Sequence, residues 1–365
     1  MHILVGYGDA PGTTGQYIED ALGAAHTVTF VGRGSGTRPG YAANLDLAAF
    51  TAEMAAEMAE AADLFLYVDS GNNPYAPTNL HALPIPTAGY FMDAYPPGIP
   101  QRTPYLETLA PFFDYLFVAH RTAIPHFQGL RAGAAVHWLP PCCDPAVHGD
   151  QHQERIYDVG FVGQVNESYP ERLQLLSALE QKYRLNDYRQ HYYREEMARI
   201  YSQSKIVVNV SHTDRIIPMR FFEAPAAGAM LLTQDSHDNG QDELLRPGEE
   251  YVSFTSVDDA LNKVDYYLAH EEERARIARA GQAAVLSRHT YAQRTAELLR
   301  VVSGDGLRRC APARQWPQVE VAKTYMRAHS QLRLVDCVME QRGVGMAPQL
   351  YYALQALLRR IRHRQ

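Results

Sequence analysis

Short apolar runs alternate with helical patterns along this chain, and this alternation constrains its fold more than any other feature. In the first 150 residues the runs are rich in β-branched and aromatic residues, as buried strands are. These runs lie at residues 2–8, 27–32, 64–69, 85–91, 115–120 and 135–139. Segments 14–24 and 47–61 between them have helical spacing. Strands that alternate with helices predict βαβ units and a mostly parallel sheet.

The alternation breaks at residues 139–153, where several prolines precede a polar stretch, and this segment is interpreted as a linker. Beyond it, strands are expected at 156–163, 206–210 and 229–233, and helices at 170–182, 194–202, 219–227, 258–270, 271–286 and 291–302. Two consecutive α/β units predict Rossmann-like domains at residues 1–150 and 151–305, facing across a cleft. Ligands of such sheets bind beyond the carboxyl ends of the strands.

Charge is unevenly distributed over the 365 residues. The formal net charge of −7 argues against a general nucleic-acid-binding protein. Beyond residue 306, however, eleven Lys and Arg residues stand against three acidic ones. The last of them, Arg359, Arg360, Arg362 and Arg364, cluster at the end of an apolar helical face of Leu350, Leu354, Leu357 and Ile361. Residues 306–365 are predicted to form a basic helical extension. It either returns to pack on the acidic N-terminal domain or contacts an anionic acceptor or a membrane surface.

Cysteines and apolar runs indicate the expected environment. No CxxC pair exists among the four cysteines, so reduced thiols are expected and a metal site is not. No apolar run reaches the ~18 residues of a membrane helix, and the N-terminus has no basic leader region. We expect a cytoplasmic protein, with the inner face of the membrane as the alternative location.

The most informative stretch is residues 217–233, IPMRFFEAPAAGAMLLT. It places Arg220 and Glu223 in the first turn of a short helix that ends at Gly228. Free N–H groups at a helix N-terminus, together with an arginine fork, can bind phosphate. A glutamate can accept hydrogen bonds from a diol such as a ribose. A capped helix with a surface ion pair would also fit this spacing.

This stretch resembles the donor-site region of GT-B glycosyltransferases. The similarity is closest to the CgeB-like group, which is named after a spore maturation protein and is related to glycosyltransferase family 4. The segments that extend it are 157–163 (YDVGFVG), 242–250 (DELLRPGEE), 266–268 (YYL) and 281–294. The resemblance covers residues 156–299 well and the first 150 residues only thinly.

The resemblance implies a nucleotide-diphosphate-sugar donor and a role for each matched residue. Glu223 matches the glutamate that holds the ribose hydroxyls, and Arg220 lies where a phosphate or nucleotide contact is expected. Gly160 and Gly163 match the strand end that lets the diphosphate approach. Family 4 enzymes usually carry a second glutamate seven residues upstream, where this chain has Ile216. The resemblance therefore does not extend to a retaining mechanism.

The residues themselves add further donor-binding candidates. Gln164 begins a polar loop, and Arg172 follows in the first turn of the next expected helix. Loop amides and arginines can neutralise a diphosphate without a metal, and the sequence has no Asp-x-Asp motif. Asn209 and His212 lie at the end of the strand expected at 206–210, on the edge that should face the ligand. A structural role fits His212 equally well.

The first domain is expected to bind the acceptor. Residues 6–15 contain G-x-G after a strand, but Pro11 replaces the third glycine of a dinucleotide-binding motif, so a dehydrogenase is not expected. Glycosyl transfer needs a base or a group that stabilises oxocarbenium charge. The candidates at strand ends are Asp9, Asp69, Asp93 and His120. Asp93 ranks first, because it follows a strand near the point where family 4 proteins place a sugar-facing histidine. Asp9 and His120 come next, or only line the cleft.

Together these features predict a metal-independent glycosyltransferase without a cofactor. It would move a sugar from a nucleotide-diphosphate sugar to a hydroxyl or amine of a carbohydrate, lipid-linked or small-molecule acceptor, and domain closure would bring the substrates together. One alternative is a sugar-nucleotide 2-epimerase on the same fold. The other is a non-catalytic sugar- or nucleotide-binding protein, which Ile216 in place of the glutamate keeps open.

Overall fold

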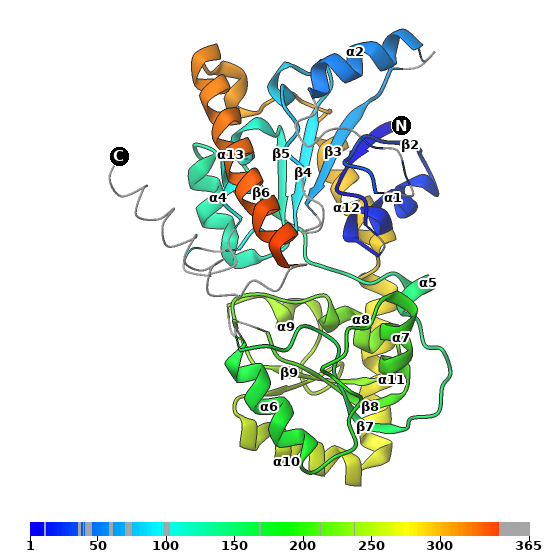
Figure 1. Cartoon of the computed structure of the whole chain (residues 1–365). Helices are drawn as coiled ribbons and strands as arrows, with labels where there is room; N and C mark the ends of the chain where they lie inside the picture. Colours follow the sequence, from blue (N-terminus) through cyan, green and yellow to red (C-terminus); the bar gives the residue numbers. More distant parts are fainter. Residues whose placement is uncertain are drawn as a thin grey trace. The chain divides into compact units, whose positions relative to one another are not determined.

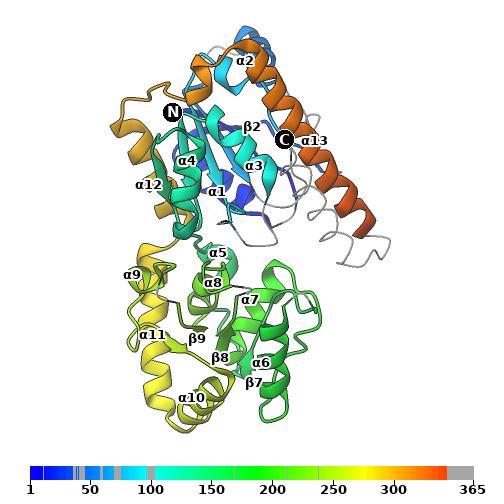
Figure 2. The same cartoon turned by 90° about the vertical axis from the view of Figure 1, so that its left-hand side faces the viewer.

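The computed structural model describes residues 1–10, 12–35, 38, 40, 46–57, 61–69, 75–95, 97, 103–167, 169–211, 213–236 and 238–342. The chain divides into two units (Figures 1 and 2). Unit 1 contains Met1–Leu139 and the chain from Leu298 onward, and unit 2 is Pro140–Glu297. The boundaries predicted at residues 150 and 305 differ from these divisions. The α/β class with parallel sheets and C-terminal helices is confirmed.

Unit 1 is built on a six-stranded parallel sheet with the order β2-β1-β3-β4-β5-β6. The strands are β1 (His2–Gly6), β2 (Thr27–Phe30), β3 (Leu64–Asp69), β4 (Thr87–Phe91), β5 (Tyr115–Val118) and β6 (Val136–Trp138). Strands β1, β3, β4 and β5 are buried along their whole length. Parallel strands with both faces covered become continuous apolar runs. These four strands therefore fall within predicted runs, and so do β2 and β6, which are partly exposed.

The helices of unit 1 include elements from both ends of the chain. They are α1 (Thr14–Gly23), α2 (Leu47–Glu57), α3 (Pro104–Leu109), α4 (Ile124–Leu130) and α13 (Gln318–Arg342), with 3₁₀ turns η1 (Leu80–Ala82), η2 (Ala110–Phe112), η3 (Arg121–Ala123) and η4 (Pro312–Gln315). Helix α12 (Tyr291–Gly304) contains the division between the units. The sequence did not predict α3 and α4, which are short and carry a proline in their first turn.

The described part of the C-terminal extension packs within unit 1. Helix α13 runs alongside α3 (Figure 2). The ring of Tyr325 stacks on Phe112 with 4.2 Å between centroids, and its hydroxyl accepts a hydrogen bond from the Leu80 N–H at 2.9 Å. Ala328 and Leu332 join the same core. The arginines predicted to form the basic end of the extension, from Arg359 to Arg364, lie outside the described residues.

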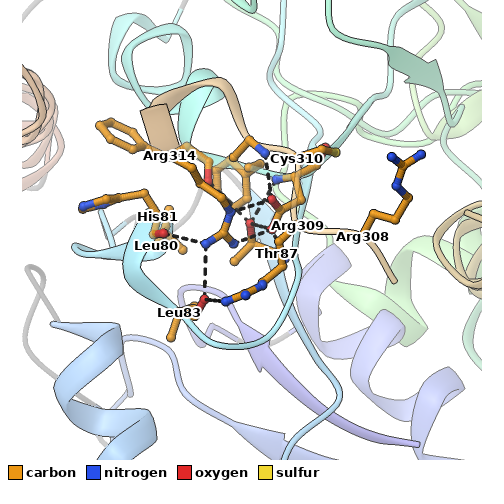
Figure 3. A network of polar contacts seen from close by, with 12 residues as sticks. Leu80, His81, Leu83, Thr87, Arg308, Arg309, Cys310 and Arg314 are labelled. Atoms are coloured by element: carbon orange, nitrogen blue, oxygen red, sulfur yellow. Dashed lines mark hydrogen bonds and ion pairs between the residues drawn. The ribbon is translucent and has the colours of Figure 1, made fainter. Parts of the chain in front are cut away.

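A buried ion pair fastens this extension to the sheet (Figure 3). The Asp114 carboxylate accepts hydrogen bonds from Nε (2.8 Å) and Nη2 (2.7 Å) of Arg314. It also accepts from the Ala311 N–H (2.7 Å) and the Thr87 N–H (2.8 Å). Nη1 of Arg314 donates to the His81 carbonyl at 2.5 Å. At this point the basic extension meets acidic charge of unit 1.

Unit 2 has a four-stranded parallel sheet with the order β10-β9-β8-β7. The strands are β7 (Tyr157–Gly160), β8 (Ser204–Asn209), β9 (Met230–Gln234) and β10 (Val252–Phe254). The helices are α5 (Pro145–His148), α6 (Pro170–Glu180), α7 (Arg194–Ser202), α8 (Arg220–Ala226), α9 (Gln241–Leu244), α10 (Val257–Ala269), α11 (Glu271–Arg288) and the start of α12. Apolar side chains from β7, β8, β9 and β10 form its core with α6, α10 and α11.

The segment interpreted as a linker belongs largely to unit 2. The Cys143 N–H donates to the His289 carbonyl and the Tyr291 N–H donates to the Cys143 carbonyl, both at 3.1 Å. The short helix α5 follows and packs against α7 and α8. None of the described helices is both long and apolar enough to cross a membrane.

Candidate functional site

Arg220 begins helix α8 and lies against the loop that follows β7. Its Nε donates to the Val162 carbonyl at 2.9 Å, and its Nη1 donates to Oδ1 of Asn209 at 2.9 Å. The guanidinium carbon lies 4.1 Å from the ring centroid of Phe161. The side chain is buried, so these contacts fix the plane of the guanidinium group. A fixed cation of this kind can stabilise an anion without further reorganisation.

Two glycines allow close approaches around this arginine. A Cβ atom at Gly163 would overlap Nη2 of Arg220, and the φ of Gly163 is +155°. The guanidinium group therefore lies directly against the loop. A Cβ atom at Gly160 would instead overlap the Ser204 hydroxyl on β8. Gly160 thus permits close packing of neighbouring strands, and Gly163 permits the arginine to reach the loop.

Arg172 approaches the same loop from the first turn of α6. Its Nη1 donates to the Gln164 carbonyl at 2.5 Å, and its Nε donates to the Val210 carbonyl at 3.2 Å. Its guanidinium carbon also lies 4.5 Å from the ring centroid of Tyr169. The predicted loop residue Gln164 therefore contributes its backbone carbonyl to the position of Arg172.

The two arginines form an electropositive site. Burial, together with the charge of Arg220, lowers the pKa of Arg172 to about 9. Among the residues that the structure describes, neither guanidinium group forms an ion pair with a carboxylate. Buried charges in proteins are normally compensated by a counter-charge. The pair is therefore suited to an anionic ligand such as a diphosphate.

Asn209 connects the arginine site to the neighbouring strand. It is the last residue of β8, and its Nδ2 donates to the Thr233 hydroxyl on β9 at 2.8 Å while its Oδ1 accepts from Arg220. This places Asn209 at the carboxyl edge of the sheet, as predicted for a candidate ligand contact. His212 lies outside the described residues.

A small polar cavity lies at the carboxyl ends of β8 and β9. Its walls include Asn209, Thr233 and the loop that contains Ile216. Nδ2 of Asn239 holds that loop by donating to the carbonyl oxygens of Asp214 (3.1 Å) and Ile216 (3.3 Å). Ile216 is buried, so where family 4 usually has a glutamate this wall carries an apolar side chain.

Glu223 lies one turn after Arg220 on α8. Its carboxyl group is buried, and burial raises its pKa to about 7. Nε2 of His148 lies 3.5 Å from Oε1 of Glu223. His148 comes from α5, within the segment interpreted as a linker, and is not among the residues predicted from the sequence. The helical spacing of Asp144 and His148 is the one signal there, and by itself it did not indicate a contact with α8.

Unit 1 holds a separate cluster of acidic and aromatic side chains at its strand ends. Asp69 ends β3, and its two carboxylate oxygens accept from the Tyr105 hydroxyl (2.8 Å) and the Asp93 N–H (3.2 Å). The Tyr95 hydroxyl donates to Oδ1 of Asp93 at 3.0 Å. Burial raises the pKa of the Asp93 carboxyl, and the Tyr95 bond opposes this rise. A carboxylate with a raised pKa is a stronger base.

The other two predicted catalytic candidates have different surroundings. The ring of His120 stacks on Tyr95 with 5.2 Å between centroids, so Tyr95 connects it to Asp93. Asp9 follows β1, where its carboxylate accepts from the Ser35 hydroxyl at 2.7 Å. The structure therefore joins Asp93 and His120 in one cluster, and it holds Asp9 through a different loop.

Residues 147–300 match a family model described as glycosyl transferase-like. No match was found among curated protein sequences. Among solved structures, Anabaena HepE in complex with UDP has 13% identity and a TM-score of 0.56, covering 83% of this chain and 100% of HepE. Sucrose-phosphate synthase from Thermosynechococcus elongatus has 11% identity and a TM-score of 0.57, covering 83% and 99%. The β-glucosyltransferase of phage T4 has 11% identity and a TM-score of 0.52, covering 83% and 99%. The fold is that of GT-B glycosyltransferases.

The matched segment separates the two groups of candidate residues on this GT-B fold. It begins at Val147 and contains His148 together with the whole Arg220 site. The cluster around Asp93 lies outside it. Unit 2 therefore carries the glycosyl transferase-like sequence, and the cluster in unit 1 stands on its own geometry.

Proposed function

We propose that this chain is a glycosyltransferase that moves a sugar from a nucleotide-diphosphate sugar to an acceptor hydroxyl group. The observation that carries the proposal is the pair of buried arginines, Arg172 and Arg220, against the Gly163 loop of the matched domain. Glycosyl transfer releases a nucleoside diphosphate, whose negative charge grows as the bond to the sugar breaks. Fixed guanidinium groups at that point stabilise the transition state.

The nucleoside part of the donor is assigned to Glu223. Its carboxylate, when ionised, accepts hydrogen bonds from two neighbouring hydroxyl groups, as a ribose offers. Complexes of HepE with UDP and with UDP-glucose support a uridine donor, since HepE shares the fold. The resemblance of the sequence to the CgeB-like group agrees with a donor site in this unit.

The reaction as we propose it needs no metal ion. Metal-dependent transferases use a divalent cation to neutralise the leaving diphosphate. Here Arg172 and Arg220 would supply that charge from one end of a single sheet. The sequence also lacks the Asp-x-Asp motif that metal-dependent transferases use.

Unit 1 would bind the acceptor, with Asp93 as the base. In a direct displacement, Asp93 takes the proton of the acceptor hydroxyl while its oxygen bonds to the anomeric carbon. The bond from that carbon to the phosphate oxygen breaks, and its electron pair leaves with the diphosphate.

The basic sequence beyond residue 342 favours an anionic or lipid-linked acceptor, and a peripheral membrane contact would serve the same purpose.

Thermal unfolding in the presence of UDP, GDP and dTDP tests the donor site. Stabilisation by at least one of them is expected, because a ligand that binds only the folded state raises its stability. NMR of a UDP-sugar mixed with candidate acceptors then tests transfer. Absence of any nucleotide effect would contradict the proposal. Donor turnover without an acceptor would favour the epimerase, and binding without turnover the non-catalytic protein.

A further inference from the structure

The residues preceding the sheet of unit 2 form a closed turn around His148. The Asp144 carboxylate accepts from the Ala146 N–H at 2.9 Å, and the Asp144 carbonyl accepts from the His148 N–H at 2.7 Å. In return, the Asp144 N–H donates to Nδ1 of His148 at 2.9 Å. The imidazole ring is therefore held at Nδ1 by the backbone of its own turn.

These bonds determine which ring nitrogen carries the proton. Nδ1 accepts a hydrogen bond, so in the neutral ring the proton is on Nε2. Burial, with the nearby charge of Arg194, lowers the pKa of His148 to about 4. Near neutral pH the ring is an uncharged donor, and its N–H group lies 3.5 Å from Oε1 of Glu223.

His148 contacts Glu223 from the interior of unit 2, where a ligand cannot reach the imidazole ring. The residue has 0% exposed surface, and α5 packs directly against α8. The separation of 3.5 Å exceeds the ~2.9 Å of an ordinary N–H···O bond. Hydrogen bonds in binding sites are often long at rest and shorten when the ligand orders the site.

We propose that His148 is a positioning residue for Glu223, holding one carboxylate oxygen so that the other can accept from the two hydroxyl groups of the ribose. This inference rests on the proposed function. A buried carboxylate with one fixed donor keeps a single orientation, and a group positioned in this way loses less freedom on binding. His148 therefore acts on the affinity for the sugar of the nucleoside, and the arginine site acts on its diphosphate.

The test compares nucleotides that differ only in the hydroxyl groups concerned. Binding of UDP, GDP and ADP, and of their 2′,3′-dideoxy analogues, is measured by calorimetry on the full chain. In the wild-type protein, removal of the hydroxyl groups should weaken binding about tenfold or more. The His148→Leu variant should lose about tenfold in affinity for the best ribonucleotide and less than about twofold for its dideoxy analogue.

Two further variants separate positioning from general damage. His148→Gln retains an N–H donor at a similar reach and should restore most of the ribonucleotide affinity. His289→Leu is the matched control: His289 is also buried in unit 2, and its ring nitrogens bond to the Leu244 carbonyl (2.9 Å) and Arg294 (2.7 Å). It should leave both affinities unchanged. If His148→Leu does not fold, His148→Asn replaces it in the same comparison.

The outcomes distinguish the two proposals. Equal weakening of the ribonucleotide and its dideoxy analogue in His148→Leu would overturn the positioning role while leaving the donor site intact. Unchanged ribonucleotide affinity in that variant would overturn it as well. Failure of the wild-type protein to bind any of these nucleotides, and dTDP as well, would overturn the proposed function, and the role of His148 with it.

Discussion

Arg314 forms a two-pronged ion pair with Asp114, at 2.8 and 2.7 Å, across 200 residues of sequence. Burial by itself would raise the pKa of Asp114, but bonds from Arg314, the Ala311 N–H and Thr87 outweigh burial and hold the pKa below its usual value. The carboxylate is fully buried and the arginine nearly so. The described part of the C-terminal extension, up to residue 342, is consequently part of the folded unit 1.

Removing the arginine should destabilise unit 1 strongly. Arg314→Met leaves the Asp114 charge buried without its partner, which typically costs about 3–5 kcal/mol of unfolding free energy. Urea denaturation of the full chain measures the loss. Arg308→Ala is the control, because the Arg308–Asp305 pair is exposed and should matter little. Equal stability of Arg314→Met and wild type would show that the pair does not hold the extension.

The Asp114–Arg314 pair and the strands around it show which features of unit 1 the sequence predicts and which it does not. Strands β1, β3, β4 and β5 of unit 1 were predictable, because a parallel strand that is covered on both faces is a continuous apolar run. The contact of Asp114 with Arg314 was not, since no local pattern links charges so far apart in the chain. Helix α5 was missed for another reason: its prolines and Asp144 are turn formers as well as helix-starting residues, so composition alone indicates a linker.

Within the candidate site, predictability followed sheet topology. Asn209 was selected because it lies at the carboxyl end of an expected strand, Gly163 because it matches the resemblance, and Arg172 because it follows in the first turn of the next expected helix. Carboxyl ends of parallel strands share one edge. The structure brings them together around Arg220 for that reason. The bond between Asp69 and Asp93 follows from the same topology, since β3 and β4 are neighbours. The orientation of His148 towards Glu223 depends on how α5 packs on α8, which no spacing reveals.

The arginine site should act on the diphosphate and not on the nucleoside. Arg220→Ala should weaken UDP binding by about 10- to 100-fold, as expected for the loss of charge-assisted bonds worth about 1.5–3 kcal/mol. Uridine, which has no phosphate, should bind both proteins equally. Calorimetry with the two ligands makes the comparison, and Arg189→Ala, at an exposed pair with Glu180, is the control. Parallel losses for UDP and uridine would instead indicate a collapsed site.

Asp93 should affect turnover without affecting the donor. Asp93→Asn should lower kcat by about 10²- to 10⁴-fold, the usual contribution of a general base, and leave UDP affinity unchanged.

The Tyr95 hydroxyl bond lowers the pKa of Asp93 against the effect of burial. Tyr95→Phe should therefore move the acidic limb of the pH–rate profile to higher pH. A limb that stays in place would assign the base to another group, with His120 the next candidate.

Glu223 should lower the stability of the folded protein at neutral pH, where its carboxylate is proposed to bind the nucleotide. Burial raises its pKa from 4.5 to about 7 in the folded protein, so the folded state favours the protonated form. Its contribution to stability is present below about pH 4.5, falls as pH rises towards 7 and is fully lost above that. The neighbouring groups are Arg220, which favours the carboxylate, and four groups that are uncharged near neutral pH: Cys142, Cys143, His148 and Tyr201.

Glu223→Gln removes this titration and should raise the unfolding free energy at pH 8 by on the order of 2 kcal/mol. At pH 4.5 the variant and wild type should differ little, because both side chains are then uncharged. Nucleotide binding should weaken at pH 8, where wild-type Glu223 is ionised, since the amide accepts through one oxygen only, and should differ little between the two proteins at pH 4.5. Denaturation at the two pH values, with UDP titrations alongside, makes the measurement. A variant that is no more stable at pH 8 would show that Glu223 is ionised in the folded protein at little cost.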